Sequence, residues 1–181
     1  MGLAVRDAVG STQQFDARDT YPLRTDMIGG GPFGLKASDW TDDTAMSLAL
    51  ADSLVADPDL DERDLTKRFV EWHEKGTYTY TCFSIGIIIC QVLARWKTTG
   101  DPFADSTDPQ TVGNGSLMRL SLVAVAHFGN RPLLRGGAAL QSRITHATSE
   151  AVKGCVVYAE ALAEAIKGGR RSQVLRARLV P

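Results

Sequence analysis

Apolar side chains recur at helical spacing through most of this chain, and that spacing constrains the fold more than any other feature. Between residues 40 and 55 one stripe is formed by Met46, Ala49, Leu50 and Leu54. The segments 61–75, 84–97 and 149–166 show the same period, whereas the strict alternation that is typical of strands is scarce. The pattern predicts an all-α fold, a bundle of several helices around a shared core.

Local signals place the ends of the helices. Acidic residues open the segment from Asp61 to Lys75, and Gly76 follows it as a stop signal. Thr148 or Ser149 is expected to cap the last long helix, which Gly168 ends. We expect helices over residues 3–14, 40–55, 61–75, 84–97 and 116–128, a shorter helix before residue 146, and a last one to residue 166. We divide the chain into a domain over residues 1–169 and a basic tail over residues 170–181 that contains Arg170, Arg171, Arg176 and Arg178.

Composition narrows the class of protein. The 181 residues carry a formal charge of −1, which gives no general reason to expect nucleic acid or a membrane surface as a partner. The 3 cysteines form no CxxC pair, so a zinc site and a disulfide framework are not expected, and a reduced, cytoplasmic setting fits better. No secretory signal is visible, and the longest apolar run, from Ile85 to Cys90, is too short to span a membrane.

Three segments contain residue types that can carry chemistry. The first is Trp40-Thr41-Asp42-Asp43-Thr44, at the start of a predicted helix. Its carboxylates, hydroxyls and carbonyls are the oxygen ligands that Mg²⁺ prefers. The same residue types are favoured as helix caps, so capping is the competing interpretation. Neighbouring helical residues point about 100° apart, so both carboxylates can share a metal only at an irregular helix end.

The second segment is Gly113-Asn114-Gly115-Ser116, which leads directly into a predicted helix, with Arg119 one turn further on. Glycines let backbone N–H groups approach an anion, and a helix N-terminus attracts negative charge. The alternative is a simple turn followed by a serine cap. The third segment, Ser142 to His146, places a histidine in a polar break between helices, where it either contacts a ligand hydroxyl or serves as a capping or surface residue.

Taken together, the order and spacing of these segments resemble the ADP-ribosylglycohydrolase family. The run Trp40 to Met46 resembles the first metal motif of that family, Gly113 to Arg119 resembles its phosphate-binding loop and helix, and Thr145-His146 resembles a pair that contacts the substrate. The opening residues, Gly2 to Gly10, resemble its first helix. The resemblance runs from about residue 2 to about residue 168.

The resemblance implies an orthogonal multi-helix bundle with a metal cleft, and hydrolysis of the glycosidic bond between ADP-ribose and a protein side chain or small molecule. Two Mg²⁺ or Mn²⁺ ions are expected in the family. Thr41, Asp42 and Asp43 would be metal ligands, and the two aspartates would also be the catalytic carboxylates. Gly113, Asn114, Gly115 and Ser116 would hold the diphosphate, Met118 would lie near the ligand, and His146 would contact a ribose.

Some positions depart from the family pattern. Gln14 and Ser84 stand where the family has carboxylates, and Arg6 replaces a glycine. The second metal motif of the family, Asp-x-Asp-Thr, does not occur before the chain ends. We therefore expect impaired catalysis, with an inactive ADP-ribose-binding protein or a non-functional gene fragment as the alternatives. We also expect apolar surface on the helix 84–97 to be left uncovered, which would produce either a homo-oligomer or a marginally stable monomer.

Overall fold

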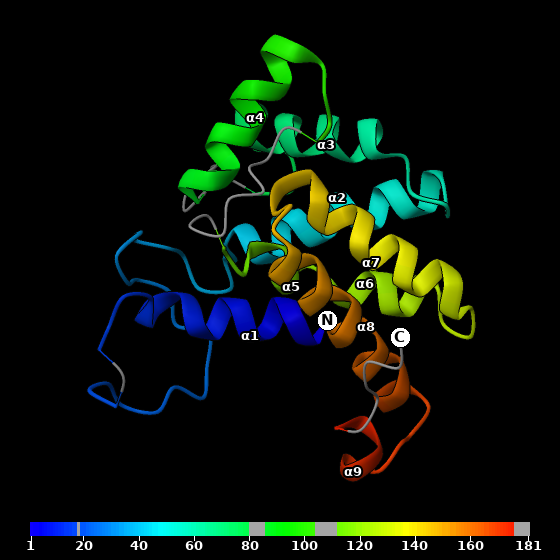
Figure 1. The fold of residues 1–181 in the computed structure, drawn as a ribbon. Helices are drawn as coiled ribbons and strands as arrows, with labels where there is room; N and C mark the ends of the chain where they lie inside the picture. The colour runs from blue at the N-terminus through cyan, green and yellow to red at the C-terminus, as the bar shows by residue number, and fades with distance from the viewer. Residues whose placement is uncertain (18, 80–85, 104–111, 176–181) are drawn as a thin grey trace.

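The computed structural model describes residues 1–17, 19–79, 86–103 and 112–175. Within these residues the all-α prediction is confirmed, since no strand is present and only Gly30 and Leu35 form an isolated antiparallel bridge. The elements in chain order are α1 (Gly2–Gly10), the 3₁₀ helix η1 (Ser11–Gln13), α2 (Asp42–Ala56), α3 (Glu62–Lys75), α4 (Ile87–Thr99), α5 (Gly115–Met118), α6 (Ser121–Ala126), α7 (Arg131–Thr145), α8 (Ser149–Ile166) and α9 (Arg171–Val174) (Figure 1). None of the helices in the described residues combines the length and the apolar character needed to cross a membrane.

One apolar core joins the helices from α2 to α8. The helices α7 and α8 run side by side, and α2 packs against α3 (Figure 1). The largest side chains that are fully buried at the centre include Trp72, Phe69, Met46, Leu50 and Ile144. In the described residues, α1 contributes nothing to this core cluster and packs outside it, mainly against α2. The core therefore holds α2 in place, while α1 lies beside it.

Helix α3 shows how local sequence determines an element. The Asp61 carboxylate accepts hydrogen bonds from the backbone N–H groups of Arg63 and Asp64, at 2.7 and 3.3 Å. Gly76 ends the helix with φ of 68°, a left-handed conformation that glycine adopts without steric cost. Thr148 caps α8 in the same manner, since its hydroxyl accepts from the N–H of Ala151. These boundaries confirm the sequence prediction.

The helix expected over residues 116–128 is divided in two. The first part, α5, ends at Met118, and α6 begins at Ser121. Arg119 and Leu120 lie between them and are both completely buried, so the chain turns at this point to direct both side chains into the core. The prediction of one continuous helix was wrong because it could not anticipate that a charged residue would be an interior one.

Two other expectations also need correction. The helix before His146 is not short, because α7 extends over 15 residues. The helix expected over 84–97 begins, in the described residues, at Ile87, and its apolar face is largely covered, with Ile89, Val92 and Leu93 buried. Ile87 remains 78% exposed. Uncovered apolar surface is therefore confined mainly to the first turn of α4, and self-association stays a prediction.

Candidate functional site

The start of α2 is held by a carboxylate from α1. One oxygen of Asp7 accepts the backbone N–H groups of Thr41 and Thr44 at 3.0 and 3.1 Å, and also the Thr44 hydroxyl at 2.6 Å. The other oxygen accepts the Thr41 hydroxyl at 2.7 Å. Thr41 is the N-cap residue but makes no side-chain cap bond of its own. Helix capping was the alternative role for Asp42 and Asp43, but Asp7, 35 positions before Asp42 in the sequence, caps this helix instead.

The two aspartates of α2 lie at its first turn in a poorly hydrated setting. Burial, and next the charge of Asp43, raise the pKa of Asp42 to about 7. Burial, and next the charge of Asp7, raise the pKa of Asp43 to about 6. Both shifts have the same physical origin, because negative charge is concentrated where water cannot disperse it. Such a site favours either a proton or a cation.

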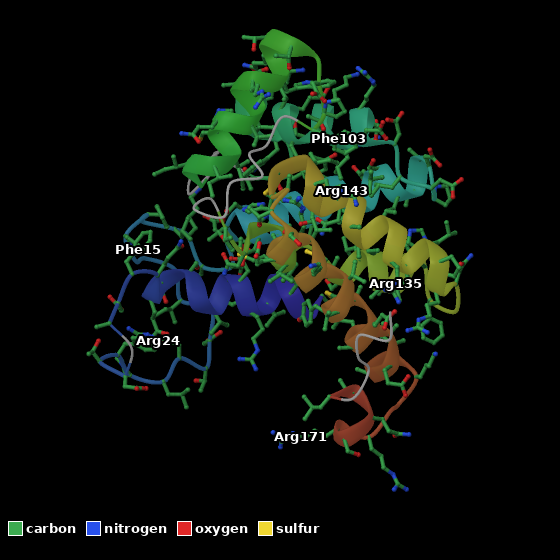
Figure 2. The ribbon with its side chains drawn as sticks, viewed as in Figure 1. Phe15, Arg24, Phe103, Arg135, Arg143 and Arg171 are labelled. Carbon is green, nitrogen blue, oxygen red and sulfur yellow. The ribbon has the colours of Figure 1, made fainter. Side chains whose placement is uncertain are left out.

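These carboxylates line a cleft of about 820 Å³. Its wall is formed by α1, the segment that follows it, the start of α2, the start of α4 and the segment before α6. The lining residues are Leu3, Arg6, Asp7, Gly10, Ser11, Gln14, Phe15, Phe33, Thr41, Asp42, Asp43, Gly86, Ile87, Asn114 and Met118. Figure 2 shows Phe15 on the segment after α1, far from Arg135 of α7. The cleft therefore combines carboxylates from α1 and α2 with the apolar side chains of Leu3, Phe15, Phe33, Ile87 and Met118.

The structure divides the loop residues between the cleft and the interior. Asn114 and Met118 line the cleft together with Thr41, Asp42 and Asp43. Ser116 is completely buried and His146 is 3% exposed. The imidazole instead packs against the loop, since a methyl group at Gly115 would lie 2.7 Å from its Cε1 atom. Contact of Gly113, Gly115, Ser116 and His146 with a ligand stays a prediction.

Of the three positions that depart from the family pattern, two lie in the residues that the structure describes. Gln14 and Arg6 both line the cleft, so the amide and the additional cation belong to the site itself. Ser84 lies outside the described residues. Sequence reasoning missed two further residues of the site, Asp7 as the cap of α2 and Phe33 as part of the wall. The available signal for Asp7 was an acidic residue in the first helix, one turn before Gly10, with no local partner.

Divalent metal chemistry is compatible with part of this arrangement. Asp42, Asp43 and the Thr41 oxygen are hard ligands of the type that Mg²⁺ and Mn²⁺ accept. A cation beside the two aspartates would offset the burial and the neighbouring negative charges that raise the pKa of both. In the described part of the chain, no group of three or more His, Cys, Asp or Glu side chains is arranged to hold a metal ion. The residues present thus fit part of a coordination shell.

The chain belongs to the ADP-ribosylglycohydrolases, because the family model of that name matches residues 1–180. The match includes residues 170–180, while the division of the chain at residue 169 stays a prediction. A solved structure described as an ADP-ribosylglycohydrolase-related protein complex superposes with a TM-score of 0.83 at 34% identity, covering 97% of this chain and 57% of the other.

Named relatives show the same kinship. The chain is 37% identical to the ADP-ribosylarginine hydrolase Tri1 of Pseudomonas putida (strain GB-1), covering 97% of this chain and 47% of the relative. It is 32% identical to the ADP-ribosyl-[dinitrogen reductase] glycohydrolase of Rhodospirillum rubrum, covering 97% of this chain and 59% of the relative. The chain thus spans about half the length of the curated relatives it matches.

Proposed function

We propose that this chain is part of an enzyme that hydrolyses the glycosidic bond between ADP-ribose and a protein side chain or small molecule. The observation that carries the proposal is the cleft that Asp42, Asp43 and Asn114 line together, because it joins the segments that the family resemblance assigns to the metal and to the diphosphate. The names of the two relatives given above support the reaction class. They also make ADP-ribosylated arginine the first substrate to test.

The diphosphate of the proposed ligand would lie at the loop that contains Asn114, Gly115 and Ser116, of which Asn114 lines the cleft, with Met118 beside it. Thr41, Asp42 and Asp43 would hold Mg²⁺ or Mn²⁺. When bound, the ion supplies polarisation of ribose hydroxyls and of the attacking water. The transition state of glycoside cleavage is similar to an oxocarbenium ion, so the negative charge of Asp42 and Asp43 stabilises the developing positive charge.

Residues that line the cleft could also transfer protons during the reaction. A carboxyl group whose pKa lies near neutrality both accepts and returns a proton at physiological pH, which is the requirement for general acid–base catalysis. Burial raises the pKa of Asp42 to about 7 while no cation is bound, so Asp42 meets this condition only in the metal-free cleft. The neutral amide of Gln14, which lines the same cleft, forms hydrogen bonds but cannot act as a base.

A second function, ADP-ribose binding without turnover, is favoured by one observation. Gln14 lies in the cleft where the family resemblance implies a glutamate. If a carboxylate at that position is needed for proton transfer, its loss lowers the rate by several orders of magnitude while leaving the contacts that bind the ligand. We therefore expect the 181-residue chain to bind ADP-ribose and to release very little of it from modified protein.

Isothermal titration calorimetry of the chain with ADP-ribose, with and without Mg²⁺, tests the proposal. We expect binding that strengthens with Mg²⁺, and loss of this strengthening in Asp43→Asn. Release of ADP-ribose from an ADP-ribosylarginine substrate, compared between the chain and Gln14→Glu, separates hydrolysis from binding alone. Absence of ADP-ribose binding under both metal conditions would refute both functions.

A further inference from the structure

A cation, Arg119, is enclosed in the core next in sequence to Met118, which lines the cleft. Arg119 is completely buried, and its hydrogen-bond partners in the described residues are all neutral. Its Nε–H donates to Oε1 of Gln141 at 2.8 Å, and Nη2 donates to the Gln141 carbonyl oxygen at 2.6 Å. The guanidinium carbon lies 4.7 Å from the ring centroid of Phe69. Burial lowers the pKa of Arg119 to about 10, so the group is still charged at neutral pH.

A buried charge of this kind lowers the stability of the fold, and the contacts of Arg119 show which residues it positions. Burying a cation without a carboxylate partner costs several kcal/mol, roughly, even when dipoles surround it. Replacing a buried charge by a well-packed apolar side chain of similar volume is often neutral or stabilising, so a purely structural core has little need of an arginine here. One of its contacts leads toward the cleft, because Nη2 also donates to Oγ1 of Thr145 at 2.7 Å.

The Thr145 hydroxyl links the guanidinium of Arg119 to the imidazole of His146. Arginine only donates hydrogen bonds, so the Thr145 oxygen is the acceptor in its contact with Arg119. The hydroxyl keeps one hydrogen to donate, and Nδ1 of His146 lies 2.9 Å away. A neutral imidazole that accepts at Nδ1 carries its hydrogen on Nε2. Burial, and next the charge of Arg119, lower the pKa of His146 to about 4, which keeps the ring neutral.

The Nε2 side of the imidazole faces the loop of the cleft. A methyl group at Gly113 would lie 2.9 Å from Nε2, and one at Gly115 would lie 3.1 Å from it. Asn114, between these glycines, lines the cleft. The imidazole therefore forms the support on which this loop rests.

A serine pair holds the same loop from its other end. The Ser142 hydroxyl oxygen lies 2.9 Å from that of Ser116 and 3.0 Å from the backbone carbonyl oxygen of His146. Both serines are completely buried. The histidine and the loop are thereby fixed to α7 as one unit.

We propose that Arg119 is a positioning residue which, through the Thr145 hydroxyl, holds His146 as the neutral imidazole protonated on Nε2 and thereby sets the loop from Gly113 to Ser116 against the cleft. The protonation state of the His146 ring does not depend on the proposed function. Any consequence for ligand binding does rest on the proposed function.

Nitrogen-15 NMR of the imidazole rings in the full chain, with His146 assigned through the backbone, measures the tautomer directly. We expect the wild type to show the pattern of a ring protonated on Nε2 alone. Thr145→Val removes the donor and should shift His146 to a mixture or to the Nδ1–H form. Thr145→Ser restores the hydroxyl and should restore the wild-type pattern, which a role limited to packing would not require.

Arg119→Gln tests the first step, and it should change the His146 pattern in the same direction as Thr145→Val. If this variant does not fold, the comparison of Thr145→Val with Thr145→Ser still decides the proposal. An Nδ1–H tautomer in the wild type, or an unchanged pattern in Thr145→Val, would overturn it. Calorimetry with ADP-ribose on the same variants tests ligand binding separately, so a failure of the proposed function leaves the tautomer result in place.

Discussion

At the scale of single residues, Asp7 and Asp42 show how one negative charge can stabilise this fold while the other destabilises it. Asp7 uses both carboxylate oxygens to bind the backbone and hydroxyl donors of Thr41 and Thr44. Asp42 is 8% exposed and has the negative charges of Asp43 and Asp7 as neighbours. Replacing each residue should therefore change stability in opposite directions.

Asp7→Ala should lower the free energy of unfolding by about 2 kcal/mol, the upper range for losing a helix cap, because two backbone N–H groups lose their acceptor. Urea unfolding followed by circular dichroism measures this change. Asp16→Ala is the matched control, since Asp16 is exposed, and it should change stability by less than about 0.5 kcal/mol. Equal effects of the two substitutions would show that Asp7 is not the cap.

Asp42→Asn should make stability less sensitive to pH. The pKa of Asp42 rises from 3.8 to about 7 on folding, so its stabilising contribution is complete below pH 3.8 and is lost as pH rises through about 7. In metal-free buffer the wild type should therefore lose stability relative to Asp42→Asn between about pH 5 and 8, by on the order of 2 kcal/mol. Urea titrations of both proteins at several pH values measure the difference. A difference that does not vary with pH would contradict the assignment.

At the scale of elements, the helices that the sequence predicts well are those whose ends are determined locally. The Asp61 cap and the Gly76 stop of α3 lie within the segment that they delimit, and Thr148 is adjacent to α8. The break after α5 is different, because it follows from the burial of Arg119 against Phe69 and Gln141, which are distant in sequence. The length of α7 was also hidden, since glycine weakens a helix and this helix contains Gly136 and Gly137.

The same distinction holds for the site. Residue types alone marked the Thr41-Asp42-Asp43 run as a candidate site and left helix capping as the competing interpretation. Only the family resemblance assigned the run to a metal, and metal binding stays a prediction. Its cap, Asp7, was not found, because the pairing requires α1 and α2 to be adjacent in space. The role of Arg119 was likewise hidden, because a cation one turn into a helix gives no local sign that it faces the interior.

A pair of glycine substitutions tests how closely the loop and the imidazole fit. Gly115→Ala should destabilise the protein by about 1–3 kcal/mol, because the new methyl would lie 2.7 Å from Cε1 of His146. Gly136→Ala in α7 meets no atom within 4 Å and should stabilise by about 0.5–1 kcal/mol through helix propensity. Thermal melts of both variants measure the contrast. Similar melting temperatures for both would mean that the loop is loosely held.

At the scale of the whole molecule, stability is distributed unevenly between the core and α1. The core cluster in the described residues is built from α2 onward, whereas Ala8 is the buried residue of α1. Opening α1 alone therefore exposes little apolar surface, and such elements open at a lower free energy than global unfolding. The cleft nevertheless takes Leu3, Arg6 and Asp7 from this helix.

Amide hydrogen exchange should therefore show faster exchange in α1 than in α3 and α8, with the backbone amides of α1 exchanging through local opening. Asp7→Ala should increase exchange in α1 further and leave α8 unchanged, because the carboxylate is a principal tie between α1 and α2. Mass spectrometry of exchanged peptides measures both effects. Uniform protection across α1 and α8 would show that the first helix unfolds only with the core.

The position of α1 outside the core also bears on affinity. Where one wall of a binding site is closed for only part of the time, the apparent dissociation constant equals the intrinsic one divided by the closed fraction. Substitutions on the outer face of α1, far from any ligand, then weaken or strengthen binding by changing that fraction alone. This fold thus contains a means of adjusting occupancy through residues of α1 that do not line the cleft, so binding can be tuned without altering a side chain that faces the ligand.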